Sequence, residues 1–282
     1  MKTAIILDSG SYYYVDSLNE KGIFAVPLQI INGNDTYMES LEISIEDVNK
    51  LLFEKNVLKT SLPSLGMIED LFNNIKNDGY DSVLVIPITS GISGTLNAMR
   101  TAAEFVGLKF NSIDCFTTAW IPQIIAIDAR KKLNEGMEIE DVIASYDEMI
   151  SKSDTFIIAD DLSHLSRSGR LSPVAAALGG FLKIKPILHL NKSTDGVIDA
   201  FSKVRTMNKA IDTLIDHMKE QGVGDGYFIG IADVGAPDLR ELTVNRIKSA
   251  FPTAKIVENQ LISTVSVHIG IGSIAFQYAK LP

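Results

Sequence analysis

Apolar residues follow two different periodicities that alternate along this chain. Short, continuously apolar runs are typical of strands buried on both faces, and apolar residues three or four positions apart are typical of amphipathic helices. The predicted strands cover residues 3–7, 24–31, 82–88, 109–113, 154–159, 184–190, 197–204, 227–233 and 256–267. The predicted helices cover residues 44–56, 64–77, 93–105, 118–133, 138–151, 172–181, 206–220, 238–250 and 271–280. Such an alternation predicts an α/β fold with a largely parallel sheet.

The connections between the predicted strands change in the second half of the chain. Strands 184–190 and 197–204 are separated only by the short polar segment 191–196, so we expect this pair to be antiparallel. We therefore predict an N-terminal α/β domain over residues 1–158, with a wound, mostly parallel sheet. A C-terminal α/β domain with a mixed sheet is predicted over residues 159–282.

A buried strand that ends in hydroxyls and glycines is the main candidate for a binding site. Residues 83–88 are apolar, and they are followed by a turn and a predicted helix. The turn contains Thr89, Ser90, Gly91, Ser93, Gly94 and Thr95. In open α/β sheets, ligands bind at the carboxyl ends of strands, and free N–H groups at a helix start suit an anion. The alternative is that these hydroxyls only cap the helix.

A second segment of similar composition contains His268. We predict a strand that enters a glycine turn at Gly270 and Gly272, followed by a short helix. His268 is therefore a candidate donor to a carboxylate, although a histidine at a strand end is often structural. The presence of both Ser93 and His268 leaves a serine hydrolase or acyltransferase open, but Gly91–Gly94 lacks the full Gly-x-Ser-x-Gly nucleophile elbow.

Composition excludes several other classes of protein. The net charge of -9 argues against nucleic acid as the main partner. A single cysteine, Cys115, excludes an internal disulfide and favours a reducing, cytoplasmic compartment. We expect no signal peptide and no stable membrane anchor, because residues 3–7 are too short an apolar run and no longer one spans a bilayer. No metal-ligand spacing or Walker motif is present, so no metal or cofactor is expected.

Basic residues are concentrated between positions 167 and 209 of this acidic chain. They are Arg167, Arg170, Lys183, Lys185, Lys203, Arg205 and Lys209. Two interpretations remain: ordinary solvated charge, or a basic surface that docks an acidic partner or a phosphate.

Motifs in order along the whole chain resemble the DegV family of bacterial fatty acid-binding proteins. The matching segments are Asp8-Ser9, Val26-Pro27-Leu28, Thr60-Ser61-Leu62-Pro63-Ser64, Ser90-Gly91-Ile92-Ser93-Gly94-Thr95, Asp161-Leu162, Ser168-Gly169-Arg170-Leu171-Ser172, Lys203-Val204-Arg205 and His268-Ile269-Gly270-Ile271-Gly272. The chain departs from the family pattern at Gly10-Ser11-Tyr12, at Ser168 and at Ile271, and the segment around Trp120 is atypical.

The resemblance implies a two-domain fold with one long-chain fatty acid in an apolar tunnel between the domains. It implies that the carboxylate is bound by Thr60 or Ser61, Ser93, Gly94, Thr95 and His268. The protein would not be an enzyme. It would be the carrier subunit of a fatty acid kinase, presenting the carboxylate to a separate, dihydroxyacetone-kinase-like ATP-dependent subunit. The acyl phosphate would then pass to an acyltransferase system that feeds phospholipid synthesis. Arg170 and Arg205 match arginines implied in partner docking.

Overall fold

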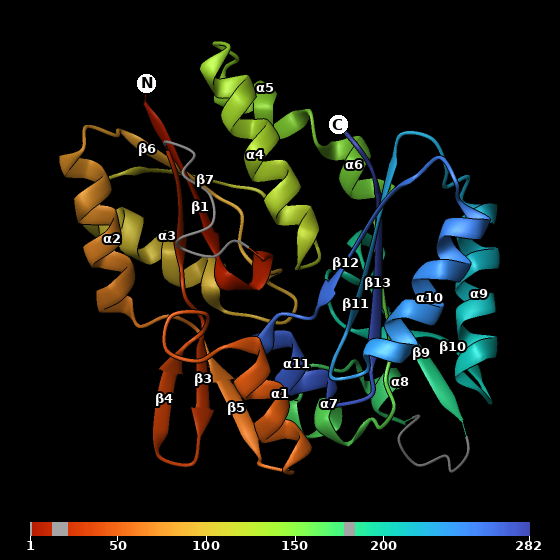
Figure 1. Ribbon diagram of the computed structural model, residues 1–282. Helices are drawn as coiled ribbons and strands as arrows, with labels where there is room; N and C mark the ends of the chain where they lie inside the picture. Colours follow the sequence, from red (N-terminus) through yellow and green to blue (C-terminus); the bar gives the residue numbers. More distant parts are fainter. Residues whose placement is uncertain (1, 13–21, 178–183) are drawn as a thin grey trace. The chain divides into compact units, whose positions relative to one another are not determined.

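Two sheets of different kinds organise the chain in the computed structural model, which describes residues 2–12, 22–177 and 184–282 (Figure 1). The first compact unit comprises residues 1–44, 58–147 and 282, and the second comprises residues 45–57 and 148–281. The α/β prediction, with a parallel sheet in the N-terminal part and a mixed sheet in the C-terminal part, is confirmed. The units divide after Asp147 rather than after residue 158, and helix α1 (Ile45–Phe53) groups with the second unit.

The main sheet of the first unit has four parallel strands in the order β2-β1-β6-β7. These strands are β1 (Thr3–Asp8), β2 (Ile23–Val26), β6 (Ser82–Val85) and β7 (Lys109–Ser112). Helices α2 (Leu65–Asn77) and α3 (Thr95–Val106) lie on one face of the sheet, and α4 (Trp120–Asn134) lies on the other (Figure 1). Because both faces are covered, the central strands are apolar at successive positions: Ile5, Ile6, Leu84 and Val85 are fully buried.

A small antiparallel sheet in the same unit has the order β4-β3-β5. Its strands are β3 (Gln29–Asn32), β4 (Asp35–Met38) and β5 (Leu58–Ser61). The predicted strand 24–31 is therefore two strands, β2 and β3, which belong to different sheets. The predicted helix 138–151 is likewise divided into α5 (Ile139–Ala144) and α6 (Asp147–Ser151).

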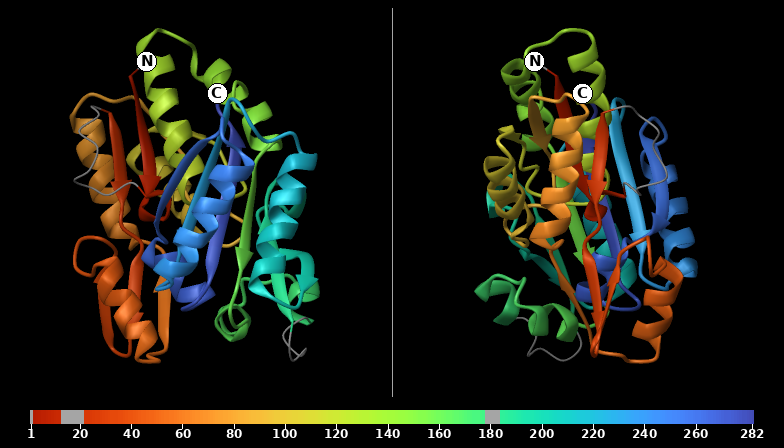
Figure 2. Two further views of the ribbon diagram at one scale, coloured as in Figure 1. Left: turned by 45° about the vertical axis from the view of Figure 1, so that its right-hand side comes forward. Right: turned by 90° about the vertical axis from the view of Figure 1, so that its left-hand side faces the viewer.

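The second unit contains a six-stranded mixed sheet in the order β10-β9-β8-β13-β11-β12. The strands are β8 (Asp154–Ile158), β9 (Lys185–Leu190), β10 (Asp199–Val204), β11 (Tyr227–Asp233), β12 (Lys255–Gln260) and β13 (Ile274–Lys280). The predicted antiparallel pairing of β9 with β10 is confirmed. Helices α9 (Met207–Glu220) and α10 (Pro237–Ala250) lie side by side over one face of this sheet (Figures 1 and 2). Phe156, Leu214 and Ile247 contribute to the core between these layers.

The last thirty residues differ most from the sequence-based expectation. The predicted strand 256–267 ends at Gln260, and a helix, α11 (Ser263–Ile269), follows it. The predicted helix 271–280 is wrong, since these residues form the turn before β13 and β13 itself. Alternating Ile274, Phe276 and Tyr278 all join the same core cluster, which requires the two-residue period of a strand.

Two short helices, α7 (Ser163–Ser168) and α8 (Pro173–Ala176), follow β8. His164 lies in helix α7. Helix α8 begins the predicted helix 172–181, of which residues 178–181 lie outside the described residues. Short 3-10 turns cover Ser9–Ser11 and Lys192–Thr194.

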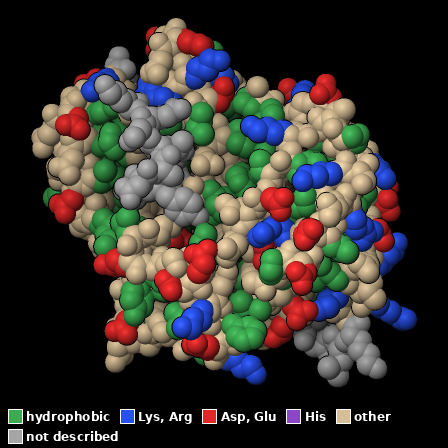
Figure 3. All heavy atoms as spheres, in the orientation of Figure 1, with side chains coloured by type: hydrophobic (Ala, Val, Ile, Leu, Met, Phe, Trp, Pro, Cys, Tyr) green, Lys and Arg blue, Asp and Glu red, His purple; other side chains and the backbone are tan. Residues whose placement is uncertain are grey.

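The surface carries charges of both signs. On the face shown in Figure 3, Lys and Arg side chains are interspersed with Asp and Glu side chains rather than gathered in one patch. Of the helices in the described ranges, none has the length and apolar character needed to cross a membrane.

Candidate functional site

The hydroxyl-rich turn predicted from the sequence follows β6 and leads into α3. Ser93 Oγ and Thr95 Oγ1 share a hydrogen bond of 2.8 Å, and the Thr95 N–H donates to Ser93 Oγ at 3.3 Å. The N-cap position itself is Gly94, which has no side chain to cap the helix. The first turn of α3 therefore presents backbone N–H groups and the Ser93 hydroxyl without a carboxylate cap, an arrangement that suits an anion.

Other hydroxyls of this turn have structural roles. Ser90 donates from both N–H and Oγ to Asp114 Oδ2, at 3.0 Å and 2.6 Å. The Thr89 side chain accepts from the Gly91 N–H at 3.2 Å, and the Thr89 N–H donates to the Thr117 carbonyl at 2.9 Å. These bonds hold the turn rigidly, so Ser93 is the better candidate for a ligand contact.

The Thr60–Ser61 segment lies beside this turn in the first unit. Both residues end strand β5, and Ser61 Oγ donates to Gln29 Oε1 on the neighbouring strand β3 at 2.8 Å. The next residue, Leu62, reaches Gly94: a Cβ added to Gly94 would lie 3.8 Å from Leu62 Cδ2. Two segments that are about thirty residues apart in sequence are therefore brought together, as the resemblance implies for the carboxylate-binding residues.

His268 belongs to the second unit, near the end of helix α11. The expectation that it ends a strand is wrong; the chain runs helix, glycine turn and then strand at this point. Burial, chiefly, and the positive charge of Arg170 lower the pKa of His268 from 6.5 to about 4. The imidazole is therefore neutral at pH 7, and one ring nitrogen is a hydrogen-bond donor while the other is an acceptor.

His164, which had no assigned role, lies next to His268. Its ring is hydrogen-bonded to the backbone of Val267, and its charge is among the causes that lower the pKa of His268. The ring is also packed against Gly270, where an added Cβ would come within 2.7 Å of His164 Cδ2. Only the fold reveals this contact, because the two residues are more than one hundred positions apart.

The basic residues of the second unit have different environments. The Arg170 guanidinium donates to the Ser168 carbonyl and lies within electrostatic range of His268. Lys185 forms an ion pair with Asp160. Arg205 is exposed just after β10, and none of the ion pairs among the described residues includes it. Lys183 lies outside the described residues. Arg205 is thus exposed, and Arg170 lies close enough to His268 to lower the pKa of its imidazole.

The Asp8-Ser9 motif is buried inside the first unit. Asp8 Oδ1 and Oδ2 accept hydrogen bonds from the Gly10 and Ile88 N–H groups, at 3.0 Å and 2.9 Å. Burial, and secondarily the nearby Glu39 carboxylate, raise the pKa of Asp8 from 3.8 to about 7. Ser9 Oγ donates to Glu39 and accepts from the Leu28 N–H. These contacts tie β1 to the segments that follow β2 and β6, so the motif supports the site without forming it.

Neither a metal site nor a reactive thiol is found in the part of the chain that the structure describes. No group of three or more His, Cys, Asp or Glu side chains is arranged to hold a metal ion there. Cys115 is buried, and burial, with a smaller effect from Asp114, raises the pKa of its thiol. The atypical Trp120 stacks on Tyr12 with ring centroids 4.6 Å apart, as part of the first unit's interior.

Comparison with known proteins supports the resemblance carried by these motifs. A family model described as "Uncharacterised protein, DegV family" matches residues 2–281. A DegV domain-containing protein of Streptococcus pneumoniae is 30% identical over 284 residues, which is 99% of each chain. The chain belongs to the DegV family.

Solved DegV structures share the fold over nearly the whole chain. A fatty acid binding DegV family protein from Streptococcus agalactiae is 30% identical, with a TM-score of 0.87 and 99% of both chains covered. A DegV fatty acid binding protein from Bacillus subtilis is 26% identical, with a TM-score of 0.88 and 99% of both chains covered. A DegV family protein from Thermus thermophilus has a TM-score of 0.88 at 22% identity, which supports the fold alone.

Within this DegV chain, the candidate residues fall into two groups. Thr60, Ser61, Ser93, Gly94 and Thr95 form the hydroxyl group of the first unit. His268, with His164 and Arg170, forms the imidazole group of the second unit. The hydroxyls of the first group and the imidazole of His268 are neutral hydrogen-bond donors of a kind that suits a carboxylate.

Proposed function

We propose that this protein binds a long-chain fatty acid. The carboxylate is bound by Ser93 and by Thr60 or Ser61, with Gly94 and Thr95 completing the turn, and by the imidazole of His268. The observation that carries the proposal is the Ser93–Thr95 hydroxyl pair at the start of α3, with the Thr60–Ser61 segment beside it. The fatty acid binding relatives from Streptococcus agalactiae and Bacillus subtilis, which cover the chain from end to end, support the ligand class.

Energetics favour a carrier that retains its ligand. Each buried methylene contributes about 0.8 kcal/mol, so an acyl chain of about sixteen carbons gains more than 10 kcal/mol before ordering costs. A ligand bound in this way does not exchange freely with water. We therefore expect the protein to be isolated with fatty acid bound.

We further propose that the protein is not itself an enzyme but presents the carboxylate to a separate, dihydroxyacetone-kinase-like ATP-dependent subunit. Hydroxyls and a neutral imidazole bind a carboxylate less completely than a bidentate arginine, so one oxygen stays available to attack ATP. The resulting acyl phosphate is consumed by an acyltransferase system for phospholipid synthesis. A cytoplasmic location fits this role, and Arg170 and Arg205 are the proposed docking residues.

The first experiment is mass spectrometry of an organic extract of the purified protein. A stoichiometric fatty acid supports the proposal and identifies the chain, whereas an extract without one contradicts it. Binding is then measured for Ser93→Ala, His268→Ala and the double variant, with Ser249→Ala, an exposed hydroxyl of α10, as the matched control. Effects of the two single variants that fail to add indicate that both side chains bind the same group.

The kinase role is tested separately with a purified kinase subunit and ATP. Acyl-phosphate formation should fall in Ser93→Ala and His268→Ala, and unchanged rates in both would remove that role. Arg205→Glu should lower the rate without changing the fatty acid content. The control is Lys209→Glu, an exposed residue in the first turn of α9. An equal effect of both variants would contradict specific docking.

A serine hydrolase using Ser93 and His268 is the alternative. The Ser93 hydroxyl shares its hydrogen bond with the Thr95 hydroxyl rather than with a basic side chain, which does not favour an activated nucleophile. Labelling by a fluorophosphonate, together with turnover of an ester, would establish the hydrolase and reject the carrier.

A further inference from the structure

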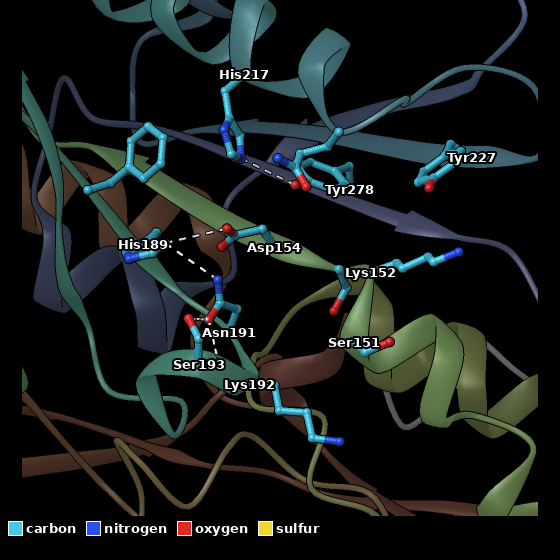
Figure 4. A pocket seen from close by; sticks show the side chains of 13 residues that line it. Ser151, Lys152, Asp154, His189, Asn191, Lys192, Ser193, His217, Tyr227 and Tyr278 are labelled. Atoms are coloured by element: carbon cyan, nitrogen blue, oxygen red, sulfur yellow. Dashed lines mark hydrogen bonds and ion pairs between the residues drawn. The ribbon is translucent and has the colours of Figure 1, made fainter.

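A polar pocket of about 440 Å³ lies within the second unit, away from the proposed fatty acid site. Its floor is formed by Asp154 at the start of β8 and by Tyr278 near the end of β13, which are paired in register (Figure 4). The His268 end of the unit adjoins the opposite end of β13, at Ile274. The four steps along the strand from Ile274 to Tyr278 span roughly 13 Å. The pocket is therefore a second, separate site.

Asp154 is a buried carboxylate at the start of β8. The residue is 7% exposed, and Oδ1 accepts a hydrogen bond from the Thr155 N–H at 2.8 Å. Among the described residues, no lysine or arginine forms an ion pair with it, and Oδ2 lies 3.4 Å from His189 Nδ1. In Figure 4 the side chains of Lys152 and Lys192 both extend away from Asp154, and Lys152 is paired with Glu148.

The neighbouring amide determines what His189 can offer. Asn191 Oδ1 accepts hydrogen bonds from the Ser193 N–H at 2.8 Å and from Ser193 Oγ at 2.6 Å. The Asn191 amide nitrogen therefore faces His189 Nδ1, at 3.5 Å, and it can donate to this ring nitrogen in the tautomer that carries the proton on Nε2. In that tautomer two acceptors, Asp154 Oδ2 and His189 Nδ1, lie 3.4 Å apart, and a positively charged group with N–H donors would satisfy both.

Aromatic rings line the rest of the pocket. The ring centroids of Phe201 and His217 are 4.9 Å apart. The ring centroid of Tyr278 is 6.5 Å from that of His217 and 6.5 Å from that of Tyr227. Burial lowers the pKa of His217, so its ring is neutral at pH 7, and burial raises the pKa of Tyr278. Neutral aromatic faces around a carboxylate attract an organic cation.

We propose that this pocket binds a small primary ammonium compound, with the ammonium donating to Asp154 Oδ2 and His189 Nδ1 and the organic part packed on Phe201, Tyr227 and Tyr278. A primary ammonium has the three donors that two facing acceptors require, whereas a quaternary ammonium has none. The proposal is independent of fatty acid binding, because all of these residues belong to one unit and to the far end of its sheet.

Isothermal titration calorimetry of the full-length protein at pH 7.5 with four probes tests the proposed ammonium site. Benzylamine should bind saturably. Benzyl alcohol is its neutral analogue, and benzyltrimethylammonium has no N–H donor; both should bind about tenfold or more weakly than benzylamine. Inorganic phosphate should not bind at the pocket. Equal binding of benzylamine and benzyl alcohol, no saturable binding of benzylamine, or displacement of benzylamine by phosphate would overturn the proposal.

Two variants and one measurement on the unaltered protein locate the site. Asp154→Asn should lose about tenfold or more in benzylamine affinity, and the exposed Asp225→Asn should lose none. Far-UV circular dichroism of each variant reports whether it is folded. If Asp154→Asn does not fold, the imidazole NMR signals of the unaltered protein decide: benzylamine should shift the His189 signal and leave that of His268 unchanged. The reverse pattern would reject this site.

Discussion

The buried imidazole of His268 gives a quantitative prediction about pH. Its pKa is lowered from 6.5 to about 4, chiefly by burial and secondarily by Arg170. In the unfolded chain the imidazole binds a proton near pH 6.5, whereas in the folded protein it does so only near pH 4. The contribution of His268 to the free energy of unfolding is therefore fully present above pH 6.5 and is lost as the pH falls toward 4. The pKa difference corresponds to roughly 3 kcal/mol.

The direct assay is an NMR titration of the four imidazoles, with His268→Gln identifying the signal that disappears. We expect the His268 signal to titrate near pH 4. Arg170→Gln should raise that pKa part of the way toward 6.5, since burial is the larger cause. A His268 pKa close to 6.5 in the unaltered protein would refute the burial argument.

Chemical denaturation measures the same effect as a change in the free energy of unfolding with pH. The stability of the unaltered protein should fall relative to His268→Gln by roughly 3 kcal/mol between pH 7.5 and pH 4. The difference between the two proteins is the informative quantity, because Asp8 titrates in the same range with the opposite sign. A difference that does not change with pH would contradict the prediction.

Three further predictions follow from other buried positions. Gly270→Ala should destabilise the protein by about 1–3 kcal/mol in denaturant unfolding, because φ is +81° and the new Cβ would meet the His164 ring. The control Gly66→Ala, inside α2 with open space around it, should be neutral or stabilising by up to about 1 kcal/mol. A larger loss of stability in Gly66→Ala than in Gly270→Ala would contradict this prediction. Asp8 should titrate near pH 7 by carboxyl ¹³C NMR; its stabilising contribution is present below pH 4 and is lost as the pH rises through 7, and titration near 4 would refute this. Cys115 should react with a thiol reagent only after unfolding, since its thiol is buried with a raised pKa, so rapid labelling of the native protein would contradict the structure.

The strands of the first core could be predicted from the sequence, because a strand that is buried on both faces has apolar residues at successive positions. Strands β1 and β6 are apolar at successive positions, since α2 and α3 cover one face of their sheet and α4 covers the other. The hydroxyl turn at Ser93 was also predictable, because its polar residues stand directly after such a strand. The pairing of β9 with β10 followed from the short connection between them.

The C-terminal segment could not be assigned in this way. Residues 265–269 alternate β-branched and polar side chains, which favours a strand, yet they belong to helix α11. Residues 274–280 form β13, which is inserted between β8 and β11, strands that lie far earlier in the chain. Local patterns carry no information about such partners, and packing against them outweighs the weak intrinsic preferences of both segments.

Local sequence therefore determined the α/β class, the parallel first sheet and the individual hydroxyl and imidazole residues of the candidate site. Tertiary structure alone decided their environments: the contact of Leu62 with Gly94, the packing of His164 on Gly270, and the burial that keeps His268 neutral. It also created the Asp154 pocket from residues of β8, β9, β13 and α9. The physical reason is that residue type sets which groups are available, whereas pKa values, unpaired charges and cavities depend on neighbours that the fold brings from distant parts of the chain.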